Sequence, residues 1–295
     1  MARVYFVTGK GGTGKSVLAR SLAEKISTQD LKVLLIKIDS FSLSTTGDDG
    51  AQFKKKNLWE QKLHLHRVME EYFETTLAKI PVPGALQKVA QKIQETVATK
   101  LLANKYVLRF VETCPGLTPS IFLGKVCWEA QDGGPDTNSR WDVVIVDAPS
   151  TGQALQIFDS AKTLSRVLTK GLISNHIADT LKFAYSHNFE IHLMTLPEEG
   201  PLQECEEMIA KFSKLELKVS QVWINKVVPE VEEQALRAYN SKDEVLSKAI
   251  QTELERIADQ KEAIQKFEAT HLEIKKARIR ELSSTQDVSF VGELP

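Results

Sequence analysis

The sequence is poor in cysteine, and the spacing of its few cysteines excludes two classes of small, cross-linked fold. The three cysteines, Cys114, Cys127 and Cys205, are odd in number and contain no Cys-x-x-Cys pair. A disulfide framework needs paired cysteines, and a zinc ribbon needs closely spaced thiol ligands. We therefore expect a chain that folds without cross-links in a reducing compartment.

The sequence also lacks long apolar runs and an excess of charge of one sign. No uninterrupted apolar run approaches the roughly 18 residues of a membrane-spanning helix, and the apolar run after Arg3 is too short for a secretory leader. Thirty-eight basic residues against thirty-nine acidic ones leave a formal charge of −1, which creates no global field to attract nucleic acid. We expect a cytoplasmic protein with no integral membrane segment and no nucleic-acid partner.

What the sequence does have is a series of short apolar runs that end at polar, glycine or proline residues. With 295 residues, of which 42% are hydrophobic, the chain is long enough to bury a full core. Continuous rather than alternating runs are typical of strands covered on both faces, and helical stretches lie between most of them. The pattern predicts an α/β fold, with a mainly parallel sheet flanked by helices on both faces. The predicted strands cover residues 4–7, 33–38, 143–146, 191–194 and 222–224.

One long stretch has a different periodicity. Between residues 49 and 131 apolar residues recur at spacings of three and four, on both sides of a break at Pro81 to Gly84. We therefore predict a main domain, which contains the sheet, from residues 1–48 and 132–295 and a mainly helical insertion at 49–131. The stretch 241–282 predicts either one long helix or a hairpin of two helices.

A glycine-rich loop follows the first predicted strand and precedes a helical pattern. Glycines in such a loop let backbone N–H groups curl around phosphate oxygens, and the helix N-terminus adds the positive end of its dipole. The loop fits the phosphate-binding motif G-x-x-x-x-G-K-[ST], and its residues are Gly9, Lys10, Gly11, Gly12, Thr13, Gly14, Lys15 and Ser16. The alternative is a glycine-rich turn without a ligand.

This loop predicts a site for ATP and Mg²⁺. Lys15 would bind the β- and γ-phosphates, and the Ser16 hydroxyl would ligate the magnesium ion. Val17, in the first turn of the helix, is counted with the nucleotide-binding residues.

The other lysine of the loop, Lys10, indicates which class of nucleotide-binding protein the chain resembles. The form Gly-Lys-Gly-Gly, with Lys10, resembles the deviant loop of the ParA, MinD and ArsA group of ATPases. The resemblance implies that Lys10 reaches across a homodimer interface to the partner's nucleotide and acts there as an arginine finger does elsewhere. The alternative is an exposed loop lysine.

Two further segments resemble the switch regions of this group. Asp39, in Lys-Ile-Asp-Ser-Phe-Ser-Leu after the second strand, matches the switch I aspartate that orients the attacking water, although Ser40 stands where the family has proline. Asp147, in Asp-Ala-Pro-Ser-Thr-Gly-Gln, matches the switch II aspartate that holds magnesium, although Gln153 replaces the usual histidine. For Asp39 a turn-capping role is the alternative.

The switch II segment is the strongest marker of one branch, that of the arsenite-pump and tail-anchored-protein-targeting ATPases. On that resemblance Asn225, which ends a late strand, would bind the adenine edge through its amide, and a residue of an ordinary strand-end turn is the alternative. The three cysteines do not align with metalloid-binding positions, and the insertion holds only one methionine, Met69.

The resemblance therefore implies a magnesium-dependent, dimeric ATPase switch that moves its helical insertion, with an unknown client or regulatory partner. A nucleotide-binding scaffold and a ParA- or MinD-like positioning ATPase remain as alternatives.

Overall fold

The computed structural model describes residues 1–38, 50–78, 113–114, 116–132, 141–168, 170, 172–239, 243–279 and 290–291. Within these residues, nine strands form one sheet in the order β3-β4-β2-β5-β1-β6-β7-β8-β9. The strands are β1 (Arg3–Gly9), β2 (Val33–Lys37), β3 (Gln52–Lys55), β4 (Leu58–Lys62), β5 (Val143–Asp147), β6 (Phe189–Thr195), β7 (Val219–Ile224), β8 (Lys275–Ile279) and β9 (Phe290–Val291).

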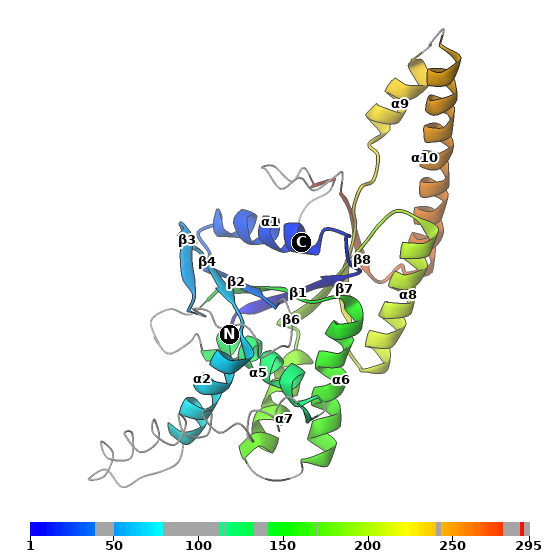
Figure 1. Cartoon of the computed structure of the whole chain (residues 1–295). Helices are drawn as coiled ribbons and strands as arrows, with labels where there is room; N and C mark the ends of the chain where they lie inside the picture. Colours follow the sequence, from blue (N-terminus) through cyan, green and yellow to red (C-terminus); the bar gives the residue numbers. More distant parts are fainter. Residues whose placement is uncertain are drawn as a thin grey trace, which may run out of the picture. The chain divides into compact units, whose positions relative to one another are not determined.

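Helices separate most of these strands in the chain (Figure 1). They are α1 (Lys15–Ser27), α2 (Leu65–Ala78), α5 (Leu117–Asp132), α6 (Thr151–Val167), α7 (Leu172–Ala184), α8 (Glu199–Lys214), α9 (Glu230–Ala238) and α10 (Glu244–Thr270). β2 pairs in parallel with β4 and β5, and β7 pairs in parallel with β6 and β8. The pairs β3–β4 and β8–β9 are antiparallel. The predicted α/β fold with a mainly parallel sheet is confirmed.

The chain divides into two compact units, and β1 contributes residues to both. The first unit comprises Met1–Tyr5 and Leu22–Phe189, and the second comprises Phe6–Ser21 and Glu190–Pro295. Each unit combines strands with helices that cover apolar strand residues.

The first unit is built on β2 and β5, whose residues are almost all buried. Such strands expose apolar side chains on both faces, and helices must cover them. Helix α5 contacts β5 and packs against α2, α6 and α7. Inside this packing the ammonium group of Lys125 lies 2.5 Å from Glu71 of α2 and 2.7 Å from Glu129. The indole N–H of Trp141 donates to Glu129 at 3.0 Å.

Two strands of the first unit lie inside the stretch 49–131, which the sequence pattern predicts to be mainly helical. β3 and β4 form a hairpin, and β4 pairs with β2 in the main sheet. All four residues of β3 are exposed, as is common in an edge strand, so they carry no apolar pattern that sequence periodicity detects. The break at 81–84 and the second predicted helix lie outside the described residues, and the division into domain and insertion stays a prediction.

The second unit contains β6, β7 and β8 together with helices α8, α9 and α10 (Figure 1). Both α8 and α9 pack against α10. The stretch 241–282 was predicted to be helical throughout, as one helix or two. It holds the single helix α10, which ends at Thr270, and residues 275–279 form β8, so the helical prediction is wrong there. Asp243 caps α10 by accepting hydrogen bonds from the backbone N–H groups of Val245 and Leu246. Strand β8 was not predicted, because its sequence Lys-Lys-Ala-Arg-Ile is mostly basic.

Two of the three cysteines lie within helices. Cys127 lies within α5, and Cys205 lies within α8. Both thiols are buried, and Cys114 is half-buried.

None of the described helices is both long enough and apolar enough to pass through a lipid bilayer.

Candidate functional site

The predicted phosphate loop joins the end of β1 to the start of α1 in the second unit. A β-carbon added at Gly9 would lie 2.3 Å from the backbone oxygen of Met194 in β6, so only glycine fits where the two strands approach. Gly12 and Gly14 have φ values of +81° and +100°, in the region that side chains with a β-carbon disfavour. The loop therefore needs its glycines for backbone geometry.

Space is open beside the middle of this loop. A β-carbon added at Gly11 or Gly12 would meet no heavy atom within 4 Å. The backbone N–H groups of the first turn of an α-helix have no partner within the helix, and here that turn begins at Lys15. The loop therefore combines an open approach with the kind of donors that bind phosphate.

Both lysines of the loop have defined partners. The Lys15 ammonium group donates to the backbone oxygen of Lys10 at 3.0 Å, and the Thr13 hydroxyl donates to the same oxygen at 2.9 Å. The Lys10 ammonium group forms an ion pair of 2.6 Å with Glu204 of α8. That ion pair is exposed to solvent, with the two side chains 62% and 49% exposed. Breaking an exposed ion pair costs little free energy, so Lys10 can leave Glu204 readily.

Asn225, which follows β7, ties the loop to the sheet. Its side chain is 2% exposed, and its amide nitrogen donates to the backbone oxygen of Thr13 at 2.9 Å. Its amide oxygen is buried and has no hydrogen-bond partner. The sequence suggested Asn225 as an adenine contact but gave no sign that it holds the loop. The role of Glu204 was also missed, because an exposed helical glutamate carries no sequence signal.

Asp147 ends β5 in the first unit and is 9% exposed. It lies in register with Lys37 of β2, and the backbone N–H of Ile38 donates to the Asp147 backbone oxygen at 3.1 Å. The ends of the two strands that precede the predicted switch segments are therefore directly bonded. Asp39 and Ser40 lie outside the described residues. Downstream of Asp147, the Ser150 hydroxyl donates to the side-chain oxygen of Gln153 at 3.5 Å.

The residues of the loop fit a nucleotide better than they fit a metal alone. The orphaned oxygen of Asn225 can accept from an amino group such as that of adenine, and the open side of the loop admits phosphate. Among the described residues, no three His, Cys, Asp or Glu side chains group closely enough to hold a metal ion. Ser16, in the first turn of α1, would hold a magnesium ion through its hydroxyl.

Comparison with known proteins agrees with this geometry. The profile of the anion-transporting ATPase family matches residues 2–186, which include the phosphate loop and Asp147. The chain belongs to this family. The anion-transporting ATPase match thus covers most of the first unit and the loop of the second.

Relatives of the chain are named as ATPases. It is 29% identical over 231 residues to "ATPase BagA" of Mycobacterium tuberculosis, a match that covers 77% of this chain and 66% of that protein. It is 23% identical over 260 residues to "Putative arsenical pump-driving ATPase 2" of Aquifex aeolicus, covering 77% and 81% of the two chains. The chain thus spans just under two thirds of the length of the mycobacterial relative.

Proposed function

We propose that this chain is a magnesium-dependent ATPase that works as a homodimeric switch. The observation that carries the proposal is the loop at residues 9–16, with its left-handed glycines, its open side and its anchor at Asn225. Membership of the anion-transporting ATPase family supports the same conclusion.

In the proposed reaction, each residue of the loop has a distinct task. Lys15 exchanges its hydrogen bond to the Lys10 carbonyl for the β- and γ-phosphate oxygens, and the backbone N–H groups of residues 11–17 surround them. The residues that would hold magnesium are Ser16, through its hydroxyl, and Asp147, through water. When bound, the metal offsets negative charge on the phosphates. Asp39 orients the water that attacks the γ-phosphorus in line with the leaving oxygen.

Lys10 supplies the link to dimer formation. In a single chain its ammonium group is bound to Glu204. We propose that it leaves this partner when two ATP-loaded protomers meet and then stabilises charge on the γ-phosphate of the partner's nucleotide. Hydrolysis forms the bond from water to the γ-phosphorus, breaks the bond to the β–γ bridging oxygen and releases a proton to solvent. When the inorganic phosphate leaves, Lys10 loses its contact across the interface, and the protomers separate. Because ATP bridges the protomers, it should promote their association.

The test is ATP hydrolysis and molecular mass, measured side by side with magnesium at increasing protein concentration. In the wild type we expect activity per chain to rise as dimers form. Lys10→Ala should still bind ATP but lose about a thousandfold in turnover, the lower range for loss of a trans-acting cation. If the wild type binds ATP but neither hydrolyses it nor dimerises, the protein is a nucleotide-binding scaffold.

Glu204→Gln tests whether the ion pair within one chain restrains Lys10. An exposed ion pair contributes at most about 1 kcal/mol, so releasing Lys10 should strengthen ATP-dependent association by no more than about fivefold. Glu207→Gln is the matched control, because Glu207 lies on the same helix and pairs with Lys211 instead. Equal association in the two variants would contradict a restraining role for Glu204.

A further inference from the structure

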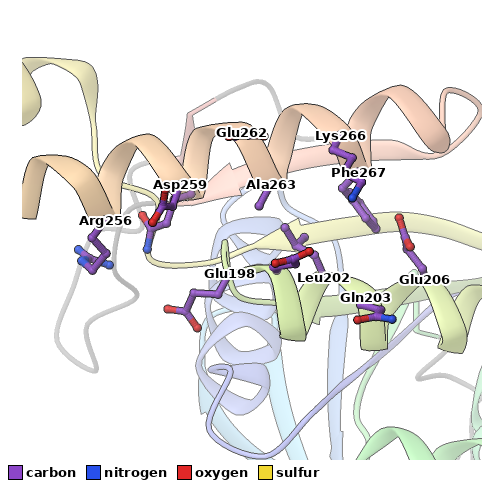
Figure 2. Close-up of a pocket in the computed structure, with 12 residues that line it drawn as sticks. Glu198, Leu202, Gln203, Glu206, Arg256, Asp259, Glu262, Ala263, Lys266 and Phe267 are labelled. Atoms are coloured by element: carbon purple, nitrogen blue, oxygen red, sulfur yellow. The ribbon is translucent and has the colours of Figure 1, made fainter.

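A groove of about 710 Å³ runs between α8 and α10 in the second unit (Figure 2). It is not part of the phosphate loop, and no step of the proposed ATPase reaction uses its residues. Its floor includes the buried side chains of Leu202 and Phe267, which are 3% and 1% exposed. Its edges are polar, and Figure 2 shows Glu198 and Glu206 on one side and Asp259 on the facing helix.

The edges of the groove carry an excess of negative charge. Five carboxylates line it, namely Glu198, Glu199, Glu206, Asp259 and Glu262. The lining holds two cationic side chains, Arg256 and Lys266.

Arg256 is already engaged, because its guanidinium donates to both carboxylate oxygens of Glu253. Glu206 faces His271 at 3.7 Å. By contrast, the carboxylates of Asp259 and Glu262 form no hydrogen bond or ion pair with any residue that the structure describes. Carboxylates so arranged attract a cation from solution.

A second observation points to a ligand and not merely to a solvated face. Gln260 lines the groove, its side chain is 5% exposed, and its amide nitrogen is buried without a hydrogen-bond partner. An unsatisfied buried donor costs about 1–3 kcal/mol, and that cost is recovered when an acceptor arrives. The missing partner is therefore an oxygen acceptor, while the surrounding carboxylates require positive charge.

We propose that the α8–α10 groove binds a polypeptide segment rich in lysine or arginine. Such a segment meets all three features of the groove. Its backbone carbonyl groups can accept from Gln260, and its cationic groups can pair with Asp259 and Glu262. The aliphatic stems of its side chains can lie along the floor of the groove, where Ala263 is partly exposed. A nucleic acid would bring its phosphates against the five carboxylates and is disfavoured.

The proposal is tested with the full chain and a short fluorescein-labelled peptide of arginine and leucine, by fluorescence anisotropy at low and physiological salt. An acidic peptide with glutamate in place of arginine is the ligand control. We expect binding of the basic peptide alone, weakened by salt because the rim charges are exposed. The double reversal Asp259→Lys with Glu262→Lys should weaken binding about tenfold or more.

The matched variant is Glu207→Lys with Glu255→Lys, which reverses two charges on the same helices outside the groove. It should weaken binding less than the Asp259→Lys, Glu262→Lys variant at physiological salt, since neither Glu207 nor Glu255 lines the groove and exposed charges are partly screened. Gln260→Leu, similar in size, tests the amide donor separately and should weaken binding severalfold at unchanged salt dependence.

Three outcomes would overturn the proposal. The first is equal affinity in the two charge-reversal variants, and the second is binding of the acidic peptide as tight as that of the basic one. The third is a wild type that binds no peptide but self-associates through these residues, because the groove would then receive a second copy of the chain. None of these readouts depends on ATP, so failure here is distinguishable from failure of the ATPase proposal.

Discussion

At the scale of the residue, Gly9 is the position where a single β-carbon has the clearest consequence. Gly9→Ala places that atom 2.3 Å from the Met194 backbone oxygen. A side chain could relieve such a clash by changing its rotamer, but a backbone oxygen within a strand cannot. We expect a loss of stability of about 1–3 kcal/mol, as for other overpacked sites, measured by urea unfolding. Gly11→Ala is the control, because no heavy atom lies within 4 Å of its added β-carbon. Equal losses in the two variants would contradict the packing argument.

Asn225 also acts as a single residue, through one buried hydrogen bond. Asn225→Ala removes the donor to the Thr13 backbone oxygen and leaves that acceptor unsatisfied, at a cost of about 1–3 kcal/mol. Because Thr13 belongs to the phosphate loop, we expect affinity for a fluorescent ATP analogue to fall about tenfold or more. Titration of the folded variant at a temperature well below its unfolding transition measures the effect. Unchanged affinity would mean that the loop keeps its conformation without this anchor.

At the scale of the element, the buried ion pairs of Lys125 join α2 to α5. Lys125 and Glu129 have side chains only 5% and 6% exposed, and Glu71 is 27% exposed. Lys125→Met leaves carboxylates without their counter-charge, which costs about 3–5 kcal/mol when one partner of a buried pair is removed. Urea unfolding checks this value.

A second variant separates lost charge from lost packing at this site. Lys125→Met combined with Glu129→Gln removes one of the uncompensated charges, while the glutamine oxygen can still accept from the Trp141 indole. The double variant should therefore be more stable than Lys125→Met alone. If it is less stable, the effect of the single substitution comes from packing.

At the scale of the whole molecule, the burial of Cys127 and Cys205 predicts that these two thiols do not bind a metalloid. Arsenite and antimonite bind thiolates. Burial raises the pKa of Cys205 to about 12 and also raises the pKa of Cys127. Both therefore stay protonated at neutral pH, because a thiol ionises only as the pH approaches its pKa. We expect one thiol, that of half-buried Cys114, to react readily with a disulfide reagent in the folded protein, and three after unfolding.

The corresponding functional expectation is that arsenite leaves ATP hydrolysis unchanged within about twofold, because it lacks the thiolate ligands that it requires. The assay is steady-state turnover with and without arsenite under reducing conditions that do not chelate it. Stimulation that disappears in Cys205→Ala would contradict this expectation and restore the metalloid as the client.

The sequence by itself determined the parts of this protein that depend on local spacing. The positions of the glycines in the loop at residues 9–16 and the buried strands, among them β5 that ends at Asp147, can be predicted because neighbouring residues set their conformation. Strands β3 and β8 escaped prediction because exposed or basic strand residues form no apolar pattern.

Tertiary structure alone decided how the loop is held. Lys10 and Glu204 are 194 positions apart, and Asn225 and Thr13 are 212 positions apart. A hydrogen bond over such separations depends on strand order and on the path of α8, which no local pattern encodes. The acidic groove has the same origin. Its carboxylates come from the start and middle of α8 and from α10, and only the packing of these two helices makes them one surface.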